Sequence, residues 1–349
     1  MFQLALLEFL KKETDAKASV FDDNYLYWGI VYKGKKVIVL IMTVHVDDLQ
    51  ITGSRSYRNW IHKKLETRFG KLKRQTMPYT HAGLQLERFV TTCIRIHQDQ
   101  FTSCLTPYVI PKDRLAVPDD PCTAAEHKTF RSLTCGALWA CQTRLEELFN
   151  VVSLQTKLQS PAIKDLIAIN SVIKRLRKNP EKFGICFRNL KAPLRISCIT
   201  DASAANKNSD FATEGVTIGL QEDRLQFPSC DRQDYLEDNL IDRLSGKLHA
   251  LVVTSTKSER VSRSTSHAET LAAARGVPMA QIIGMRLVEP EINILCGPQK
   301  PLQLQERLDK GQLSLPVDAY VDCMDLWELC CGLRGNPQDK SQRLGILSL

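Results

Sequence analysis

The sequence has no hydrophobic run long enough to cross a membrane. Its longest apolar stretch, residues 37–46, already contains Thr43 and His45, whereas a membrane-spanning helix needs about 20 consecutive apolar residues. At the N-terminus, Lys11 and Lys12 follow the apolar residues instead of preceding them, which is the reverse of the order in a secretory signal. We therefore expect a cytoplasmic or nuclear protein that is neither secreted nor held in a membrane.

Closely spaced metal-binding cysteines and histidines are also missing. The 12 cysteines form no C-x-x-C pair, and the 7 histidines form no H-x₃₋₅-H pair. The usual zinc motifs are thereby excluded, and we also expect no small-molecule cofactor. What is present is the composition of a folded protein, with 349 residues of which 43% are hydrophobic and 25% are charged. This length is enough for about two domains.

Positive charge is concentrated in the first part of the chain. The formal net charge is +8, and basic side chains gather in residues 55–74 and 174–191, each of which contains a single acid. Such runs suit a polyanion, because each Lys or Arg placed on a phosphate releases a condensed counterion. The alternative is a solvated helix face. The candidate nucleic-acid-binding residues are Arg55, Arg58, Lys63, Lys64, Lys71, Lys73, Arg74, Lys174, Arg175, Arg177 and Lys178.

The hydrophobic pattern alternates between strand and helix periods along the whole chain. It predicts a helix over residues 55–69, a hairpin over 82–97 and a largely helical segment over 126–185. A second helix is predicted over 266–288 and a third over 324–333. The predicted strands are residues 25–32, 37–46, 49–52, 194–200, 216–220, 248–254 and 317–321.

Three carboxylates stand at positions where they can converge. Asp201 and Asp322 each end a predicted strand, and Glu269 lies in the first turn of the long predicted helix. If the two strands are neighbours and the helix packs over them, the three side chains meet. Hard cations such as Mg²⁺ take oxygen ligands of this kind, together with substrate phosphate.

Several of the candidate carboxylates also have a purely structural interpretation. Ser266 and Glu269 fit a capping box, in which the glutamate accepts from the backbone N–H of the cap residue. Asp201 can start a turn with Ala202 and Ser203. The adjacent pair Asp47-Asp48 follows a predicted strand, and a hairpin turn accounts for it without any catalytic role.

Six segments of the chain resemble motifs that occur together, in the same order, in one known family. His45-Val46-Asp47-Asp48 with residues 49–53 resembles the Y-V-D-D-L-x-I-x-G signature of its reverse transcriptase. Residues 82–87 resemble the F-L-G-I-E-I hairpin, and residues 130–144 resemble the Y-R-S-L-x-G-x-L…T-R-P-D segment. In the second half, residues 199–203, 255–269 and 320–322 resemble the Asp strand, the S-x-K…S-S-T-E-A-E block and the Y-x-D strand of the attached ribonuclease H domain. With all six segments in order, the chain resembles the copia-type retrotransposon Pol polyprotein.

The resemblance implies α+β and α/β architecture in three parts. Residues 1–110 would form a partial reverse-transcriptase palm and the start of the thumb, and residues 111–191 a helical thumb and connection. Residues 192–349 would form an RNase H-like mixed-sheet domain. The implied activity is hydrolysis of RNA in RNA–DNA hybrids by two-metal catalysis with Mg²⁺ or Mn²⁺. The implied metal-binding and catalytic residues are Asp201, Glu269 and Asp322, with Asp47 and Asp48 as polymerase-like ligands.

The sequence also departs from the family pattern. The family's polymerase carries another metal-binding Asp on a palm strand upstream of the aspartate pair, and no such strand is evident in the 46 residues before Asp47. His45 replaces the usual Tyr, and Gly345 stands where the ribonuclease H domain carries a fourth Asp. We therefore expect weak or absent polymerase activity and a truncated ribonuclease H domain. The alternative is a catalytically dead nucleic-acid-binding relic of a retroelement.

Overall fold

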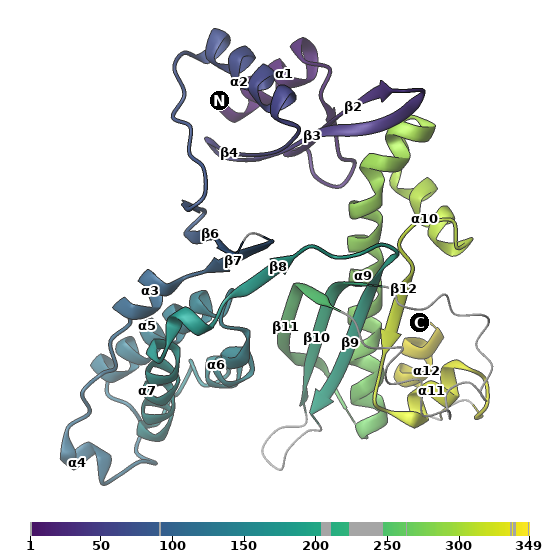
Figure 1. Ribbon diagram of the computed structural model, residues 1–349. Coiled ribbons are helices and arrows are strands. Elements are labelled where there is room, and N and C mark those ends of the chain that lie inside the picture. Colours follow the sequence, from purple (N-terminus) through teal and green to yellow (C-terminus); the bar gives the residue numbers. More distant parts are fainter. Residues whose placement is uncertain are drawn as a thin grey trace. The chain divides into compact units, whose positions relative to one another are not determined.

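The structure is a computed structural model that describes residues 2–90, 92–203, 211–222, 247–262, 264–335, 337, 340–347 and 349 (Figure 1). The chain forms two compact units, and each is built from two separate segments. Unit 1 consists of Met1–Thr76 and Met279–Val317, and unit 2 consists of Met77–Pro278 and Asp318–Leu349.

Within the described residues the fold combines helices with three four-stranded sheets, whose orders are β1-β2-β3-β4, β5-β6-β7-β8 and β11-β10-β9-β12. This confirms the α+β class at the coarse level. No helix in the described part of the chain has both the length and the apolar character that crossing a membrane requires.

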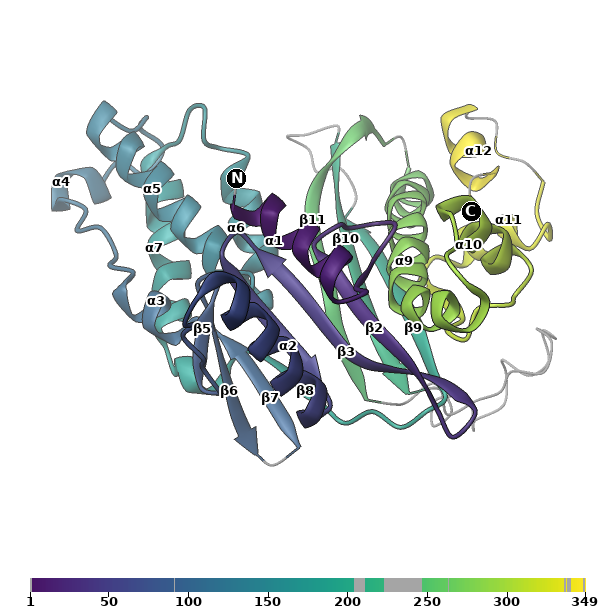
Figure 2. The same cartoon turned by 90° about the horizontal axis from the view of Figure 1, so that it is seen from above.

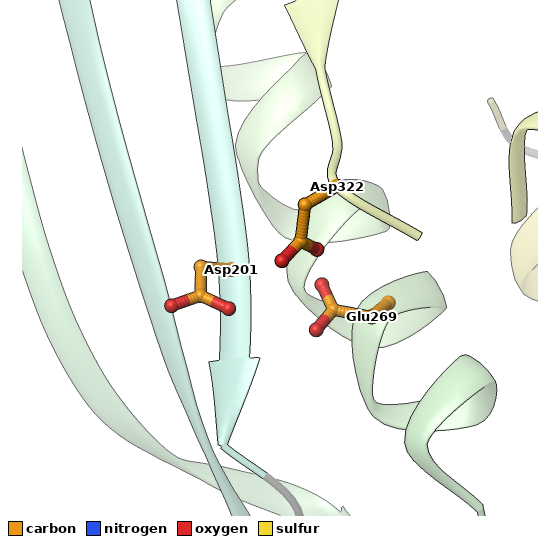
Figure 3. Close-up of side chains that lie close together, drawn as sticks. All are labelled: Asp201, Glu269 and Asp322. Atoms are coloured by element: carbon orange, nitrogen blue, oxygen red, sulfur yellow. The ribbon is translucent and has the colours of Figure 1, made fainter. Parts of the chain in front are cut away.

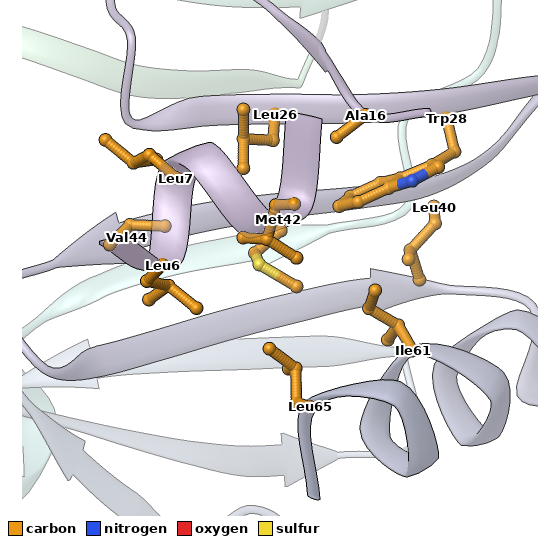
Figure 4. Close-up of a cluster of buried hydrophobic side chains, with 11 residues drawn as sticks. Leu6, Leu7, Ala16, Leu26, Trp28, Leu40, Met42, Val44, Ile61 and Leu65 are labelled. Carbon is orange, nitrogen blue, oxygen red and sulfur yellow. The ribbon is translucent and has the colours of Figure 1, made fainter. Parts of the chain in front are cut away.

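The sheet of unit 1 is an antiparallel meander covered on one face by two helices. Its strands are β1 (Lys17–Ala18), β2 (Tyr25–Tyr32), β3 (Lys35–His45) and β4 (Asp48–Gly53). The helices are α1 (Phe2–Glu13) and α2 (Arg55–Phe69). On β3, Leu40, Met42 and Val44 are buried at every second position, so they share one face and pack with residues of both helices, including Leu6 and Ile61 (Figure 4).

The C-terminal part of helix α9 (Thr265–Cys296) is also joined to this sheet. Glu289 on α9 is fully buried and accepts hydrogen bonds from Ser19 Oγ at 2.5 Å and from Val20 N at 2.8 Å. Asn293, one turn later, donates to the hydroxyl of Tyr27 on β2 at 2.7 Å. Helix α10 (Pro301–Asp309) completes unit 1 through Leu304, which lies in a small core with residues of α9.

The first part of unit 2 joins a second sheet to a helical cluster. The strands are β5 (Tyr79–His81), β6 (Leu84–Val90), β7 (Cys93–His97) and β8 (Ile185–Arg188). Phe130, Ala137, Leu166 and Ile173 form the buried centre of the cluster. Its α-helices are α3 (Asp99–Cys104), α4 (Lys112–Leu115), α5 (Ala124–Ala140), α6 (Leu148–Gln155) and α7 (Ile163–Arg177). Short 3₁₀ turns lie at Leu145–Glu147 and Pro180–Lys182.

The predicted helical segment over residues 126–185 is correct for most of its length and wrong at its end. Helix α7 stops at Arg177, and Ile185 opens strand β8, which pairs with β7. Pairing with a strand about 90 residues earlier in the chain cannot be read from local periodicity.

The third sheet carries the predicted carboxylates. Strands β9 (Leu194–Ser203), β10 (Phe211–Glu222) and β11 (Leu248–Val261) are antiparallel neighbours. On the other side of β9 lies β12 (Val317–Tyr320), and the arrows of β9 and β12 point the same way in Figure 1, so the sheet is mixed.

Helix α9 begins beside this sheet and packs closely on it (Figures 1 and 2). A Cβ on Gly276 would lie 2.7 Å from Thr200 Cγ2 and 3.0 Å from Cys198 Sγ. Glycine at this position therefore allows the helix to approach β9. Helices α11 (Met324–Cys330) and α12 (Lys340–Leu347) follow β12.

Candidate metal centre

Asp201 projects from a regular strand. It lies within β9, opposite Gly215 of β10, and its side chain is exposed. The strand continues to Ser203, so the alternative in which Asp201 starts a turn is wrong. The neighbouring residue Ala202 is also paired in the sheet, with Glu214. A side chain on such a paired strand is held in a fixed direction.

Glu269 occupies the start of α9 and is almost completely buried, with 3% of its surface exposed. Its Oε1 accepts a hydrogen bond from the backbone N–H of Ala202 at 3.1 Å. The glutamate therefore reaches across to β9 and does not complete a capping box with Ser266. Among the described residues, no group hydrogen-bonds to its second oxygen, Oε2.

Asp322 completes the group from the loop after β12. The three carboxylates of Asp201, Glu269 and Asp322 offer ligand oxygens that all lie within 4.8 Å of one another. Figure 3 shows the three side chains pointing toward a common centre, one from a strand, one from a helix and one from the end of a second strand. The structure thus brings together the three residues that the sequence placed on separate elements.

The electrostatics of the cluster disfavour three free negative charges. Burial raises the pKa of Glu269 to about 7 from an ordinary value of 4.5, and the charges of Asp322 and Asp201 add to this rise, while the Ala202 N–H opposes it. A buried carboxylate beside two others gains either from a proton or from a cation.

The donor set fits a hard divalent cation. All three side chains offer carboxylate oxygens, and one of these oxygens is buried without a hydrogen bond from the described residues. Mg²⁺ and Mn²⁺ prefer oxygen ligands and are commonly held by a few carboxylates with the remaining positions left to water and substrate.

Gly345 on α12 lies against Thr270 at the start of α9. A Cβ on Gly345 would lie 2.8 Å from Cγ2 of Thr270, the residue that follows Glu269. One turn earlier on α12, Gln342 donates to Ser266 Oγ at 2.9 Å. The position at which the resemblance expects a fourth carboxylate therefore packs against the residue that follows Glu269, and it carries no side chain.

Asp47 and Asp48 are placed differently. They lie at the turn between β3 and β4, both are exposed, and His45 pairs with Asp48 across the hairpin. Within the described part of the chain, neither aspartate joins a group of three metal-ligating side chains. Val46 at the same turn has a φ of 57°, a conformation that is strained for a β-branched residue.

The basic residues of the first run lie on α2 and on the segment that follows it, and all are exposed. The four candidate residues of the second run, Lys174, Arg175, Arg177 and Lys178, lie at the end of α7, and Arg175 already makes an ion pair. Arg175 donates to both carboxylate oxygens of the buried Glu147, at 2.5 and 2.8 Å. Binding of nucleic acid by the other residues stays a prediction.

Two features of the site could not be found from side-chain types. The Ala202 N–H that orients Glu269 is a backbone group, and the contact between Gly345 and Thr270 depends on how α12 docks on α9. The spacing of Asp201, Glu269 and Asp322 at element ends was the signal that sequence could supply.

Comparisons with protein-family models, with curated proteins and with solved structures give no match to this chain. Its function has to be inferred from the sequence motifs and from the geometry of the carboxylate cluster.

Proposed function

We propose that this chain is a copia-like retrotransposon Pol fragment, in which a partial reverse transcriptase is joined to an RNase H-like domain. The proposed reaction is hydrolysis of the RNA strand of an RNA–DNA hybrid. The observation that carries the proposal is the convergence of Asp201, Glu269 and Asp322 within 4.8 Å, because the resemblance names the same three residues as metal ligands.

The arrangement of the third sheet supports the RNase H-like assignment. Strand β9 carries Asp201 in the interior of the sheet, β12 lies beside it, and the chain turns at Asp322 directly after β12. Helix α9, which carries Glu269, packs over the same strands through Gly276. In this interpretation residues 192–349 form the nuclease part, and residues 1–110 and 111–191 form the palm and the helical connection.

The three carboxylates of the cluster would have different roles in binding the cations. Glu269, held by the Ala202 N–H, would be the fixed inner ligand, and the exposed Asp201 and Asp322 would hold cations on the side open to a phosphodiester. Bound Mg²⁺ or Mn²⁺ supplies Lewis acidity, which makes water a better nucleophile and offsets the charge of the leaving oxygen. The basic residues of α2 and α7 would contact the backbone of the hybrid.

The test is cleavage of an RNA–DNA hybrid by the full chain with Mg²⁺, compared with the Asp201→Asn variant. We expect cleavage that this substitution abolishes and that a chelator also abolishes. The control is the double variant Asp47→Asn with Asp48→Asn, which should cleave at the wild-type rate. Equal background cleavage by the wild type and by Asp201→Asn would refute the enzymatic assignment.

Two observations favour the alternative of a catalytically dead nucleic-acid-binding relic. Gly345 offers no fourth carboxylate beside Glu269, and among the described residues Asp47 and Asp48 have no third ligand. The relic would bind a hybrid without cutting it. Because Asp47 and Asp48 have no third ligand among the described residues, we expect weak or absent primer extension, and robust extension by this chain would overturn that expectation.

A further inference from the structure

The tip of the β2–β3 hairpin in unit 1 is a basic surface with an exposed aromatic ring. Residues 31–36 are all exposed. Tyr32 has 57% of its surface accessible and Val31 has 68%. Large exposed side chains that gather at one point of a protein surface often mark an interaction site.

The geometry of the tip places the ring between two lysines. The turn consists of Lys33 and Gly34, whose φ angles of 49° and 75° fit a tight two-residue hairpin loop. Tyr32 is the cross-strand partner of Lys35, so these two side chains lie on the same face of the hairpin. The Nζ of Lys33 lies 5.5 Å from the centre of the Tyr32 ring.

The opposite face of the tip has a different role. Val31 is paired with Lys36, and Lys36 Nζ donates to the carbonyl of Leu295 at 3.2 Å. This face therefore turns toward the end of α9. In contrast, no acidic side chain pairs with Lys33 or Lys35 among the residues that the structure describes, and residues 24–46 contain no acid at all.

We propose that the face formed by Tyr32, Lys33 and Lys35 binds single-stranded nucleic acid. A base stacks on Tyr32, and the two lysines contact the flanking phosphates. Non-specific single-strand binding commonly combines an aromatic ring with positive charge in this way. The proposal rests on the proposed function only in taking a nucleic acid as the partner of the chain.

The distribution of side chains favours this partner over a membrane or an acidic peptide. A membrane surface would require large apolar side chains beside the lysines, and the exposed Val31 lies on the other face. An acidic peptide would need the lysines but would gain little from the ring. The tip is also separate from Asp47 and Asp48, because β3 has 11 residues, which at ~3.3 Å per residue separates the two hairpin ends by about 35 Å.

The test measures binding of a fluorescein-labelled oligodeoxythymidylate to the full chain by anisotropy, in chelator so that cleavage does not interfere. We expect Tyr32→Ala to weaken binding about 5- to 100-fold, which corresponds to one stacked base, and Tyr32→Phe to bind almost as the wild type does. Lys33→Ala and Lys35→Ala should each lower the slope of log K against log salt by about 0.7.

Val31→Ala is the matched control, because it removes an equally exposed side chain from the same tip but from the other face. It should bind as the wild type does. Wild-type binding by Tyr32→Ala, or equal weakening by Val31→Ala, would overturn the proposal, as would binding to phosphatidylserine vesicles but not to the oligonucleotide.

The same assay separates this proposal from the nuclease assignment. If Tyr32→Ala weakens binding but the chain shows no Mg²⁺-dependent cleavage, the proposed binding surface stands and the nuclease assignment is refuted. If the chain cleaves hybrids but Tyr32→Ala does not change oligonucleotide binding, the nuclease assignment stands and the proposed binding surface is refuted.

Discussion

Asp47 and Asp48 are neighbours in the sequence, whereas Asp201, Glu269 and Asp322 lie on a strand, a helix and a loop that are far apart in the chain. Yet the neighbouring pair stands exposed at a hairpin turn, and the distant three meet within 4.8 Å. The pair in unit 1 has the more recognisable sequence signature, and the group in unit 2 has the geometry that can hold a cation. The difference shows that adjacency in the sequence does not by itself assemble a metal site, whereas residues far apart in the chain can do so when strands and a helix bring them together.

The largest expected effect is a difference between the carboxylate cluster and the Asp47-Asp48 pair in how Mg²⁺ changes the free energy of unfolding. Glu269→Gln should abolish the stabilisation by Mg²⁺, which is about 2.7 kcal/mol when the ion is at a hundredfold excess over its Kd. Without metal at pH 8 the same variant should be more stable than the wild type by roughly 1–3 kcal/mol, because it removes a buried, repelled charge. Urea unfolding with and without Mg²⁺ measures both free-energy differences.

Asp47→Asn combined with Asp48→Asn provides the comparison for this experiment. Because both side chains are exposed, the double variant should keep the metal response and change the free energy of unfolding by less than about 0.5 kcal/mol. Loss of the Mg²⁺ effect in this variant would show that the cation binds at Asp47 and Asp48 in unit 1, and not at the cluster in unit 2.

A second effect follows from the raised pKa of Glu269. The folded-state pKa is about 7, above its ordinary value of 4.5, so folding favours the protonated carboxyl. This contribution is fully present below pH 4.5 and is lost as the pH rises through 7. In chelator, the stability of the wild type relative to Glu269→Gln should therefore fall by roughly 1–3 kcal/mol between pH 4.5 and pH 8, and a constant difference would contradict the burial of this group.

A smaller effect concerns the missing fourth carboxylate. Gly345→Asp alone should destabilise the protein by about 1–3 kcal/mol, because its Cβ meets Thr270 Cγ2 at 2.8 Å. Adding Thr270→Ser should restore most of the loss, since serine lacks that methyl group and keeps the hydroxyl that donates to the Ser266 carbonyl. Thermal unfolding measures both steps, and Mn²⁺ titration of the double variant should show tighter binding. Full stability of Gly345→Asp by itself would show that α12 is not packed so closely on α9.

The smallest effect tests the strained turn in unit 1. Val46 has a φ of 57°, which costs a non-glycine residue about 1–2 kcal/mol. Val46→Gly should therefore stabilise the protein by about 1 kcal/mol in urea unfolding. Asp47→Gly is the control, since the other turn residue has no positive φ and should gain nothing. A gain of the same size at Asp47 would attribute the effect to something other than backbone strain.

Much of the local structure was predictable from the hydrophobic pattern. Residues 25–32 and 55–69 were predicted with the bounds that β2 and α2 have. The first segment is rich in aromatic and β-branched residues and ends at Lys33-Gly34, and the apolar residues of the second recur at helical spacing. Strands β10 and β11 are longer than predicted, since polar residues at their ends are also paired in the sheet.

Helix α9 was predicted to end at residue 288, but it runs on past Pro290 to Cys296. Proline normally ends or kinks a helix. Here Glu289 and Asn293 on either side of it are held by Ser19, Val20 and Tyr27. These contacts join segments about 270 residues apart, and local sequence gives no sign of them.

The sequence could predict which residues form the candidate site, but not the contacts that hold them in position. Strand ends and a helix start gave Asp201, Asp322 and Glu269. The alternatives of a capping box and of a turn could be decided only by the hydrogen bond between Glu269 and Ala202 and by the pairing of Asp201 in β9. The activity, the partner and the three-part division at residues 110 and 191 stay predictions.

Helix α9 has a practical consequence for anyone who wishes to express only part of the chain. It has 32 residues, or about 48 Å of helix, and it starts in one compact unit and finishes in the other. Expressing residues 1–191 alone would deprive Ser19 and Tyr27 of their hydrogen-bonding partners and would expose the sheet surface that α9 contacts. Each compact unit is built from two separate segments of the sequence, so the chain is best handled whole.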